Sequence, residues 1–216
     1  MAFMKFQSLT HNMLKNGSGS WNGEGRLLNI DTGIKSYGYS QASLDASSPF
    51  AATKVSKCWV EASSDIRPGN LIEDLGYDAK WFVMSSLPQI TGEEIVYWDA
   101  TLYRVSDYFT LQRFVPGGKD AFGRDIDPTI TSLNVVDGVS VPVPTMVNPQ
   151  AYGTAVQQDI IQETNKIRVA IQSKYLVQKN DRLMDKDGFC LIVENIDRYT
   201  LGIHGIHILW VDEDTR

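Results

Sequence analysis

Acidic residues near the end of the chain have a spacing that could bind calcium. Asp185, Asp187, Gly188 and Glu194 fill positions 3, 5, 6 and 12 of a calcium-binding loop, whose oxygen ligands surround a hard cation. Position 1 must be a carboxylate, but it is Leu183, and the flanks have strand patterns where the loop needs helices. The sequence therefore predicts a two-residue hairpin turn at Asp187-Gly188 and no metal site.

His204, His207 and Cys190 are the other residues of metal-ligating type in this region. Residues three apart on a strand point to opposite faces of the sheet. A bulge at Gly205 could bring the two imidazoles together, but we expect one to face solvent and the other to be packed or hydrogen-bonded. The sequence therefore predicts no metal ligands.

Catalytic groups are equally sparse. Glu93 and Glu94 could act as a general acid and base, but they follow Thr91-Gly92 in an expected hairpin tip, where solvated charge is common. The run 17–20, Gly-Ser-Gly-Ser, lacks the strand and helix that flank a nucleophile elbow. Neither a phosphate-binding loop nor a dinucleotide fingerprint occurs. We therefore expect no catalytic residue and no cofactor, and predict that the protein is not an enzyme.

Aromatic residues gather in the middle of the chain and leave three interpretations open. They could form a hydrophobic core, a subunit interface, or a platform that binds sugars or bases by stacking. Alternating strand positions favour the core. The residues are Trp81, Phe82, Tyr97, Trp98, Tyr103, Tyr108 and Phe109.

The composition is that of an ordinary globular protein, with 216 residues, 26 acidic and 20 basic side chains, and a net charge of −6. This sign disfavours general binding to phosphate backbones. Two cysteines 132 positions apart, Cys58 and Cys190, match no zinc or disulfide framework, and we expect both to be free core thiols. No apolar run approaches the roughly 20 residues that span a bilayer. The polar N-terminus is unlike a signal peptide, so synthesis and retention in a cytoplasm are expected.

Hydrophobic periodicity divides the chain into four expected parts. Residues 1–52 form an N-terminal arm with a short helix that ends at Asn16-Gly17, residues 53–116 a β unit, residues 117–150 a long loop rich in Pro and Gly, and residues 151–216 a small β-barrel unit that opens with a short helix. The expected fold class is mainly β, with one or two small antiparallel barrel or sandwich units. We expect the arm and the long loop to become ordered across subunit boundaries.

A weak internal similarity suggests two related β units. Residues 69–74 precede the strand 81–83 as residues 180–185 precede the strand 191–193. In addition, residues 107–111 are similar to residues 197–201.

Two stretches resemble known virion proteins. The string Lys179 to Asp185, with Gly188-Phe189, residues 191–194 and a last strand ending Leu209-Trp210-Val211, looks like the small β-barrel of tailed-bacteriophage head-to-tail connector proteins of the head-closure or stopper group. The block from Ile66 through Val83 to Val105 is similar to segments of phage neck proteins. Together they cover about half of the chain. The resemblance implies a ring-forming subunit with no catalytic residue to transfer.

The sequence-based hypothesis is therefore a structural protein of the phage neck, made in the host cytoplasm and located in the virion. Its expected partners are further copies of itself in a ring, the portal or adaptor, and the tail proteins. Double-stranded DNA would pass through the channel without specific binding, because an acidic subunit repels phosphate. No membrane partner is expected. The alternative is a tail-tip or baseplate module that binds through the aromatic residues, and a small hydrolase-like enzyme is a distant third.

Overall fold

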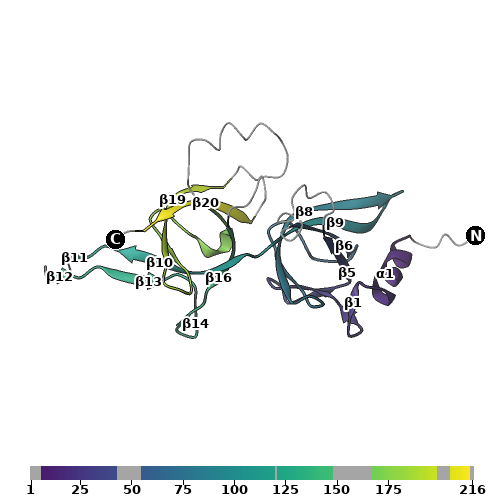
Figure 1. Cartoon of the computed structure of the whole chain (residues 1–216), viewed down its shortest axis with the longest axis horizontal. Coiled ribbons are helices and arrows are strands. Elements are labelled where there is room, and N and C mark those ends of the chain that lie inside the picture. Colours follow the sequence, from purple (N-terminus) through teal and green to yellow (C-terminus); the bar gives the residue numbers. More distant parts are fainter. Residues whose placement is uncertain (1–5, 43–54, 120, 148–166, 199–204, 215–216) are drawn as a thin grey trace, which may run out of the picture. The chain divides into compact units, whose positions relative to one another are not determined.

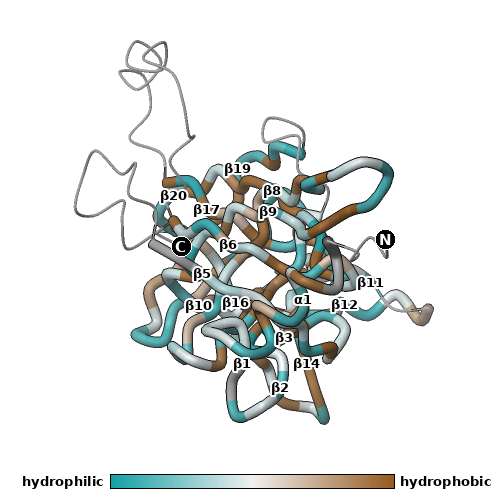
Figure 2. The backbone as a smooth tube through the Cα atoms, turned by 90° about the vertical axis from the view of Figure 1, so that its right-hand side faces the viewer, coloured by the Kyte–Doolittle hydropathy of each residue, from teal (hydrophilic) through white to brown (hydrophobic). Residues whose placement is uncertain are grey.

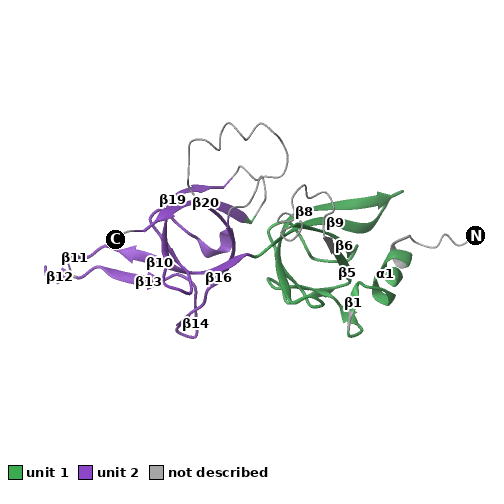
Figure 3. Cartoon of the chain, in the orientation of Figure 1, with its two compact units in different colours: residues 1–105, 203–205 green, residues 106–202, 206–216 purple. Residues whose placement is uncertain are grey.

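The computed structural model describes residues 6–42, 55–119, 121–147, 167–198 and 205–214. It confirms a mainly β protein with antiparallel strand pairing. Two compact units divide the chain, the first formed by residues 1–105 with 203–205 and the second by the remainder (Figure 3). This division differs from the expected one, because the boundary lies at Val105 and residues 20–42 belong to the first unit.

The first unit is a rolled antiparallel sheet in the order β4-β3-β7-β8-β9-β6-β5. Its two edge strands, β4 and β5, are separated only by Tyr37, so one continuous segment forms both edges and closes the sheet on itself. We call this unit barrel 1. Its strands are β3 (Leu27–Asn29), β4 (Lys35–Ser36), β5 (Gly38–Ala42), β6 (Val55–Glu61), β7 (Leu71–Asp74), β8 (Ala79–Thr91) and β9 (Glu94–Arg104).

Two small elements precede barrel 1. The helix α1 (Phe6–Asn16) is followed by the hairpin of β1 (Ser20–Trp21) and β2 (Glu24–Gly25). The expected helix end at Asn16-Gly17 is confirmed. The expected extended arm is not found in the described residues up to Ala42, because β3 to β5 pair within their own chain.

The second unit is a closed six-stranded barrel, which we call barrel 2. Pairing of β10 with β18 closes the ring β10-β16-β17-β20-β19-β18 (Figure 1). Its strands are β10 (Asp107–Val115), β16 (Val143–Val147), β17 (Ile167–Gln172), β18 (Arg182–Met184), β19 (Cys190–Asp197) and β20 (Ile206–Glu213), with the 3₁₀ turn η2 (Ser173–Tyr175) after β17. The short helix expected near residues 152–163 lies outside the described residues.

The two barrels have the same strand order. We count the segment β4–β5 as one strand and number the strands of barrel 1 from 1 to 6 along the chain, as β3, β4–β5, β6, β7, β8 and β9. Around the ring, neighbouring strands then follow the order 1-4-5-6-3-2. Barrel 2, counted from β10, follows the same order. All of these pairings are antiparallel in both units.

The turns that enter β7 and β18 are also equivalent. In Arg67–Asn70 and in Gln178–Asp181, the fourth residue donates its backbone N–H to the first carbonyl, at 3.1 and 3.2 Å. The side chain of the fourth residue accepts the backbone N–H of the first, at 2.7 and 2.6 Å. The third residue has positive φ in each, 90° at Gly69 and 70° at Asn180, a conformation that glycine and asparagine tolerate best.

A β-bulge occurs at matching places. The register of β8 against β9 shifts between Val83 and Ser85, and that of β19 against β20 shifts between Val193 and Asn195. Val83 and Val193 also make the same backbone hydrogen bonds to the turns just described. The first similarity noted in the sequence therefore falls on equivalent strands, whereas residues 107–111 and 197–201 do not, because the former lie on β10 and the latter begin at the end of β19.

Each barrel has its own hydrophobic core, built from inward-facing residues at equivalent positions. Burial of such apolar surface is the main favourable contribution to folding. In barrel 1 the core consists of Leu27, Cys58, Val60, Ile66, Ile72, Val83, Ala100 and Leu102. Their counterparts in barrel 2 are Phe109, Val169, Ile171, Val177, Leu183, Val193, Leu209 and Val211.

The barrels differ most in the connection that follows their first strand. In barrel 1 only residues 30–34 join β3 to β4, whereas in barrel 2 the end of β10 and the residues after it, 114–141, form an additional segment that we call the insertion. Much of the expected long loop falls in the insertion, which forms short hairpins. Its strands are the end of β10, β11 (Gly118–Lys119), β12 (Asp125–Ile126), β13 (Thr129–Ser132), β14 (Val135–Val136) and β15 (Val139–Ser140).

Candidate functional site

The acidic segment around Asp187 is a hairpin, but not with the expected two-residue turn. Asp185 donates its backbone N–H to the carbonyl of Phe189, which leaves three residues, 186–188, between this hydrogen-bonded pair. Only Gly188 there has positive φ, at 86°, as in three-residue hairpins that end in a left-handed glycine. The carboxylate of Asp185 accepts the N–H groups of Asp187 and Phe189, both at 2.8 Å, so it stabilises the turn.

His207 is on β20, while His204 lies outside the described residues. Partial burial and the nearby positive charge of Arg198 lower the pKa of His207. Among the described residues, no group of three His, Cys, Asp or Glu side chains could hold a metal ion. Both cysteines are free. Cys58 is a core thiol whose burial raises its pKa, whereas Cys190 is only partly buried, so the expectation of a core position is wrong for Cys190.

Glu93 and Glu94 lie at the connection between β8 and β9, as expected, and Gly92 there has positive φ. Each barrel also contains an ion pair in which an arginine binds a buried aspartate through two nitrogens. Arg26 binds the fully buried Asp74 through Nε, at 2.7 Å, and Nη2, at 3.2 Å. Burial lowers the pKa of Arg26, but its hydrogen bonds to Asp74 and Tyr77 outweigh this effect and raise it.

Barrel 2 has a comparable pair between Arg113 and Asp181. Both contacts, from Nε and from Nη2 of Arg113, measure 2.7 Å. Two shallow clefts of about 510 and 370 Å³ flank Lys179 and Asn180 next to this pair. The carboxylate of Asp181 already accepts two hydrogen bonds from the guanidinium group of Arg113. The described residues that line these clefts therefore bring together no nucleophile and base.

The aromatic residues are mostly buried or partly buried, which agrees with the favoured interpretation of core packing. On β8, Trp81 and Val83 face the core, and Phe82 and Met84 are buried on the opposite face, so Phe82 is not an exposed interface residue. Trp98 donates its Nε1–H to the carbonyl of Ala62 at 3.0 Å. Three of the seven are buried, namely Phe82, Tyr103 and Phe109, and three are partly buried, namely Trp81, Tyr97 and Trp98. Only Tyr108 of the seven is exposed.

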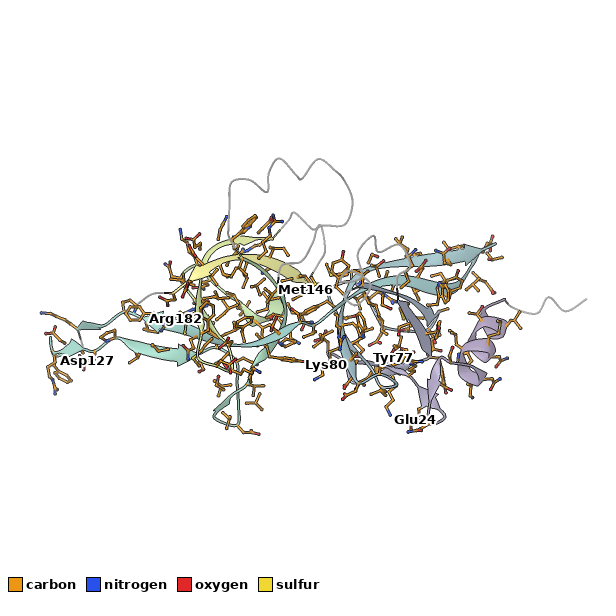
Figure 4. The ribbon with its side chains drawn as sticks, in the orientation of Figure 1. Glu24, Tyr77, Lys80, Asp127, Met146 and Arg182 are labelled. Atoms are coloured by element: carbon orange, nitrogen blue, oxygen red, sulfur yellow. The ribbon has the colours of Figure 1, made fainter. Side chains whose placement is uncertain are left out.

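Exposed apolar side chains concentrate on the insertion. Of the eighteen large hydrophobic residues exposed in the described part of the chain, eight lie between residues 114 and 141. Figure 2 shows the brown, hydrophobic stretches around β14 and near the tip of β11–β12, and Figure 4 labels Asp127 near that tip. The eight are Phe114, Val115, Phe122, Ile130, Val135, Val136, Val139 and Val141, of which Phe122 is the most exposed, at 82%.

A second exposed surface lies on barrel 1, where neighbouring strands place four outward-facing side chains in one row. Tyr39 on β5 pairs with Trp59 on β6, which pairs with Asp99 on β9, which pairs with Leu87 on β8. The sequence does not reveal Tyr39, because residues 36–48 have the composition of an extended arm. The signal that could have found it is the alternation of Tyr37 and Tyr39 with small residues.

Comparison with protein-family models, with curated proteins and with solved structures finds no match to this chain. No helix among the described residues is long and apolar enough to span a membrane.

Proposed function

We propose that this protein is a structural subunit of the bacteriophage neck, which forms a ring between the DNA-filled head and the tail. The single observation that carries the proposal is the insertion of barrel 2. Barrel 1 closes with residues 30–34 in its place, so the insertion is not needed to form the fold. Exposed apolar residues gathered on hairpins that the fold does not require are typical of a protein–protein interface.

The insertion also has the strand chemistry that assembly through β-sheets uses. In the pairing of β10 with β13, Phe114 lies opposite Ile130, and both side chains are exposed. The second edge of β13 has no partner strand among the described residues, and Thr129–Ser132 includes no charged residue or proline that would block pairing with another chain. A neighbouring subunit would cover these groups.

The class of assembly comes from the resemblance of the chain to phage connector and neck proteins. Two antiparallel barrels with a projecting insertion are compatible with it, and a net charge of −6 suits a channel through which DNA must pass without being held. On this proposal the ring contacts the portal or adaptor on one side and tail proteins on the other. The tail-tip alternative loses its expected platform, because only one of the seven aromatic residues is exposed.

Electron microscopy of the purified chain, and of the phage particle with the protein labelled, tests the proposal. We expect rings in solution or a ring at the neck. The triple variant Phe122→Ser, Val136→Ser, Val139→Ser should abolish rings and leave a folded monomer, because all three side chains are exposed. The matched control is Leu176→Asn, which replaces an equally exposed residue of barrel 2 at positive φ. A wild-type chain that stays monomeric and is absent from the neck would overturn the proposal.

A further inference from the structure

The outward row on barrel 1, formed by Tyr39, Trp59, Asp99 and Leu87, combines two aromatic rings with an acidic group. The rings of Tyr39 and Trp59 are near parallel, at 25°, with centroids 6.2 Å apart. This separation is far greater than a face-to-face contact, so the rings are offset and neither covers the other completely. Trp59 is 40% exposed and Leu87 is 63% exposed.

Comparison with barrel 2 shows that the fold does not require aromatic residues here. By the shared register, the counterparts of Tyr39, Trp59 and Asp99 are Met146, Ala170 and Ile208. These three are buried, small or aliphatic residues. Barrel 1 therefore presents two rings and a carboxylate, partly open to solvent, at positions where the same architecture is stable with apolar side chains.

The chemistry of the row indicates one class of ligand. Aromatic faces stack on the C–H faces of sugar rings, and a carboxylate accepts hydrogen bonds but donates none, which suits hydroxyl groups. Lys57 lies opposite Thr101 in the neighbouring outward row, and its positive charge balances the negative charge of Asp99. A nucleic acid would place phosphates beside Asp99, which repels them, whereas a neutral polyhydroxyl chain meets no such penalty.

We propose that Tyr39, Trp59 and Asp99 form a binding surface for a neutral polysaccharide, in which sugar rings stack on the two aromatic faces and hydroxyl groups donate to Asp99. This site is independent of the insertion and of the ring assembly. The row of four residues runs across four adjacent strands and is extended, a shape that fits several units of a chain instead of one enclosed monosaccharide.

Isothermal titration calorimetry of the full chain with cellohexaose, maltohexaose, mannohexaose and chitohexaose tests the proposal. We expect at least one to bind with micromolar to millimolar affinity. Trp59→Ala should weaken that binding at least tenfold, as loss of a central aromatic contact does, and Asp99→Ala should weaken it severalfold. Lys57→Ala should change it little. Tyr108→Ala, which removes an exposed ring from barrel 2, is the matched control and should leave affinity unchanged.

Thermal melting of each variant separates loss of binding from loss of folding. Trp59 and Tyr108 are both exposed, so both variants should melt near the wild-type temperature. No binding of any of the four oligosaccharides at millimolar concentration, or binding that survives Trp59→Ala, overturns the proposal. Tight binding of single-stranded oligo-dT that Trp59→Ala abolishes would assign the surface to nucleic acid, and a change in oligomeric state on Trp59→Ala would assign it to a protein interface; either result also overturns it.

Discussion

Barrel 1 and barrel 2 share strand order and register but place the ion pairs of their buried aspartates at different positions. In barrel 1 the pair is Arg26 with Asp74, and the position equivalent to Arg26 in barrel 2 is Tyr108. In barrel 2 one such pair is Arg113 with Asp181, and the equivalent positions in barrel 1 are Asp31 and Asn70.

This difference separates what defines the fold from what each barrel adds. The inward apolar positions, the bulge in the long hairpin and the left-handed residue before β7 or β18 are common to both units. The polar pairs are not common, although each is well hydrogen-bonded. A buried pair is seldom the source of a fold's stability, but removal of one partner is costly because the other charge remains buried.

Loss of the buried carboxylate of barrel 1 should have the largest effect. Asp74→Ala leaves Arg26, itself almost fully buried, without its partner, and also removes acceptors for Ser40 Oγ and the N–H of Gly76. We expect a loss of about 3–5 kcal/mol in the free energy of unfolding. Asp181→Ala should cost about 1.5–3 kcal/mol, because Arg113 can reach solvent. Urea denaturation followed by circular dichroism measures both.

The paired replacement Arg26→Met, Asp74→Leu is the control for this prediction. With both charges removed, most of the lost stability should return, since apolar residues of similar volume often replace a buried pair without penalty. A double variant as unstable as Asp74→Ala would show that the pair is required for barrel 1 to fold.

Equivalent core positions should respond alike. Ile72 and Leu183 are fully buried and occupy the same place on β7 and β18. Ile72→Ala and Leu183→Ala should each cost about 2–5 kcal/mol, through lost apolar burial and the cavity that remains. The measurement is again urea denaturation. If one variant loses stability within this range and the other falls outside it, the two cores are not packed equivalently.

The sequence is sufficient to predict the strands but not to predict how they close into barrels. Runs such as Lys80–Met84 and Phe189–Val193 have the residue types of strands, and these segments do form β8 and β19. In residues 36–48 the small residues Ser36, Gly38 and Ser40 interrupt the apolar alternation, and this pattern predicts an arm. Ser36, Gly38 and Ser40 are in fact buried, and an added Cβ at Gly38 would lie 2.3 Å from Leu27 Cδ1, so small residues are needed there for close packing.

The candidate site shows the same limit. Alternation on a strand identifies which residues share a face, but it does not identify which strand lies beside it. The row of Tyr39, Trp59 and Asp99 comes from three strands whose adjacency depends on the ring order, so it was not visible from any one segment. The turn at Asp187-Gly188 was placed correctly but given the wrong length, because the side chain of Asp185 extends it.

The residue with positive φ that precedes β7 in barrel 1 and β18 in barrel 2 can be exchanged between the barrels by mutation. Gly69 has a φ of 90° and Asn180 a φ of 70°. Gly69→Ala should cost about 1–2 kcal/mol, the penalty of a Cβ in this conformation, whereas Gly69→Asn should cost less because barrel 2 already uses asparagine there. Thermal melting distinguishes the two variants. If Gly69→Ala melted at the same temperature as Gly69→Asn, the two turns would not share an energetic preference for a residue that tolerates positive φ.

His207 should give the smallest effect, through pH. Its counterpart in barrel 1 is Trp98, which does not titrate near neutral pH. Burial and Arg198 lower the pKa of His207 in the folded state, so the unfolded state takes up a proton first as pH falls. The stability that His207 contributes is therefore complete above its ordinary pKa of about 6.5 and decreases below it. We expect the melting temperature of the wild type to fall slightly more than that of His207→Phe between pH 8 and about pH 5.5. Because carboxylates titrate equally in both proteins, the difference between the two falls isolates the histidine, and no difference would show that its environment does not resist protonation.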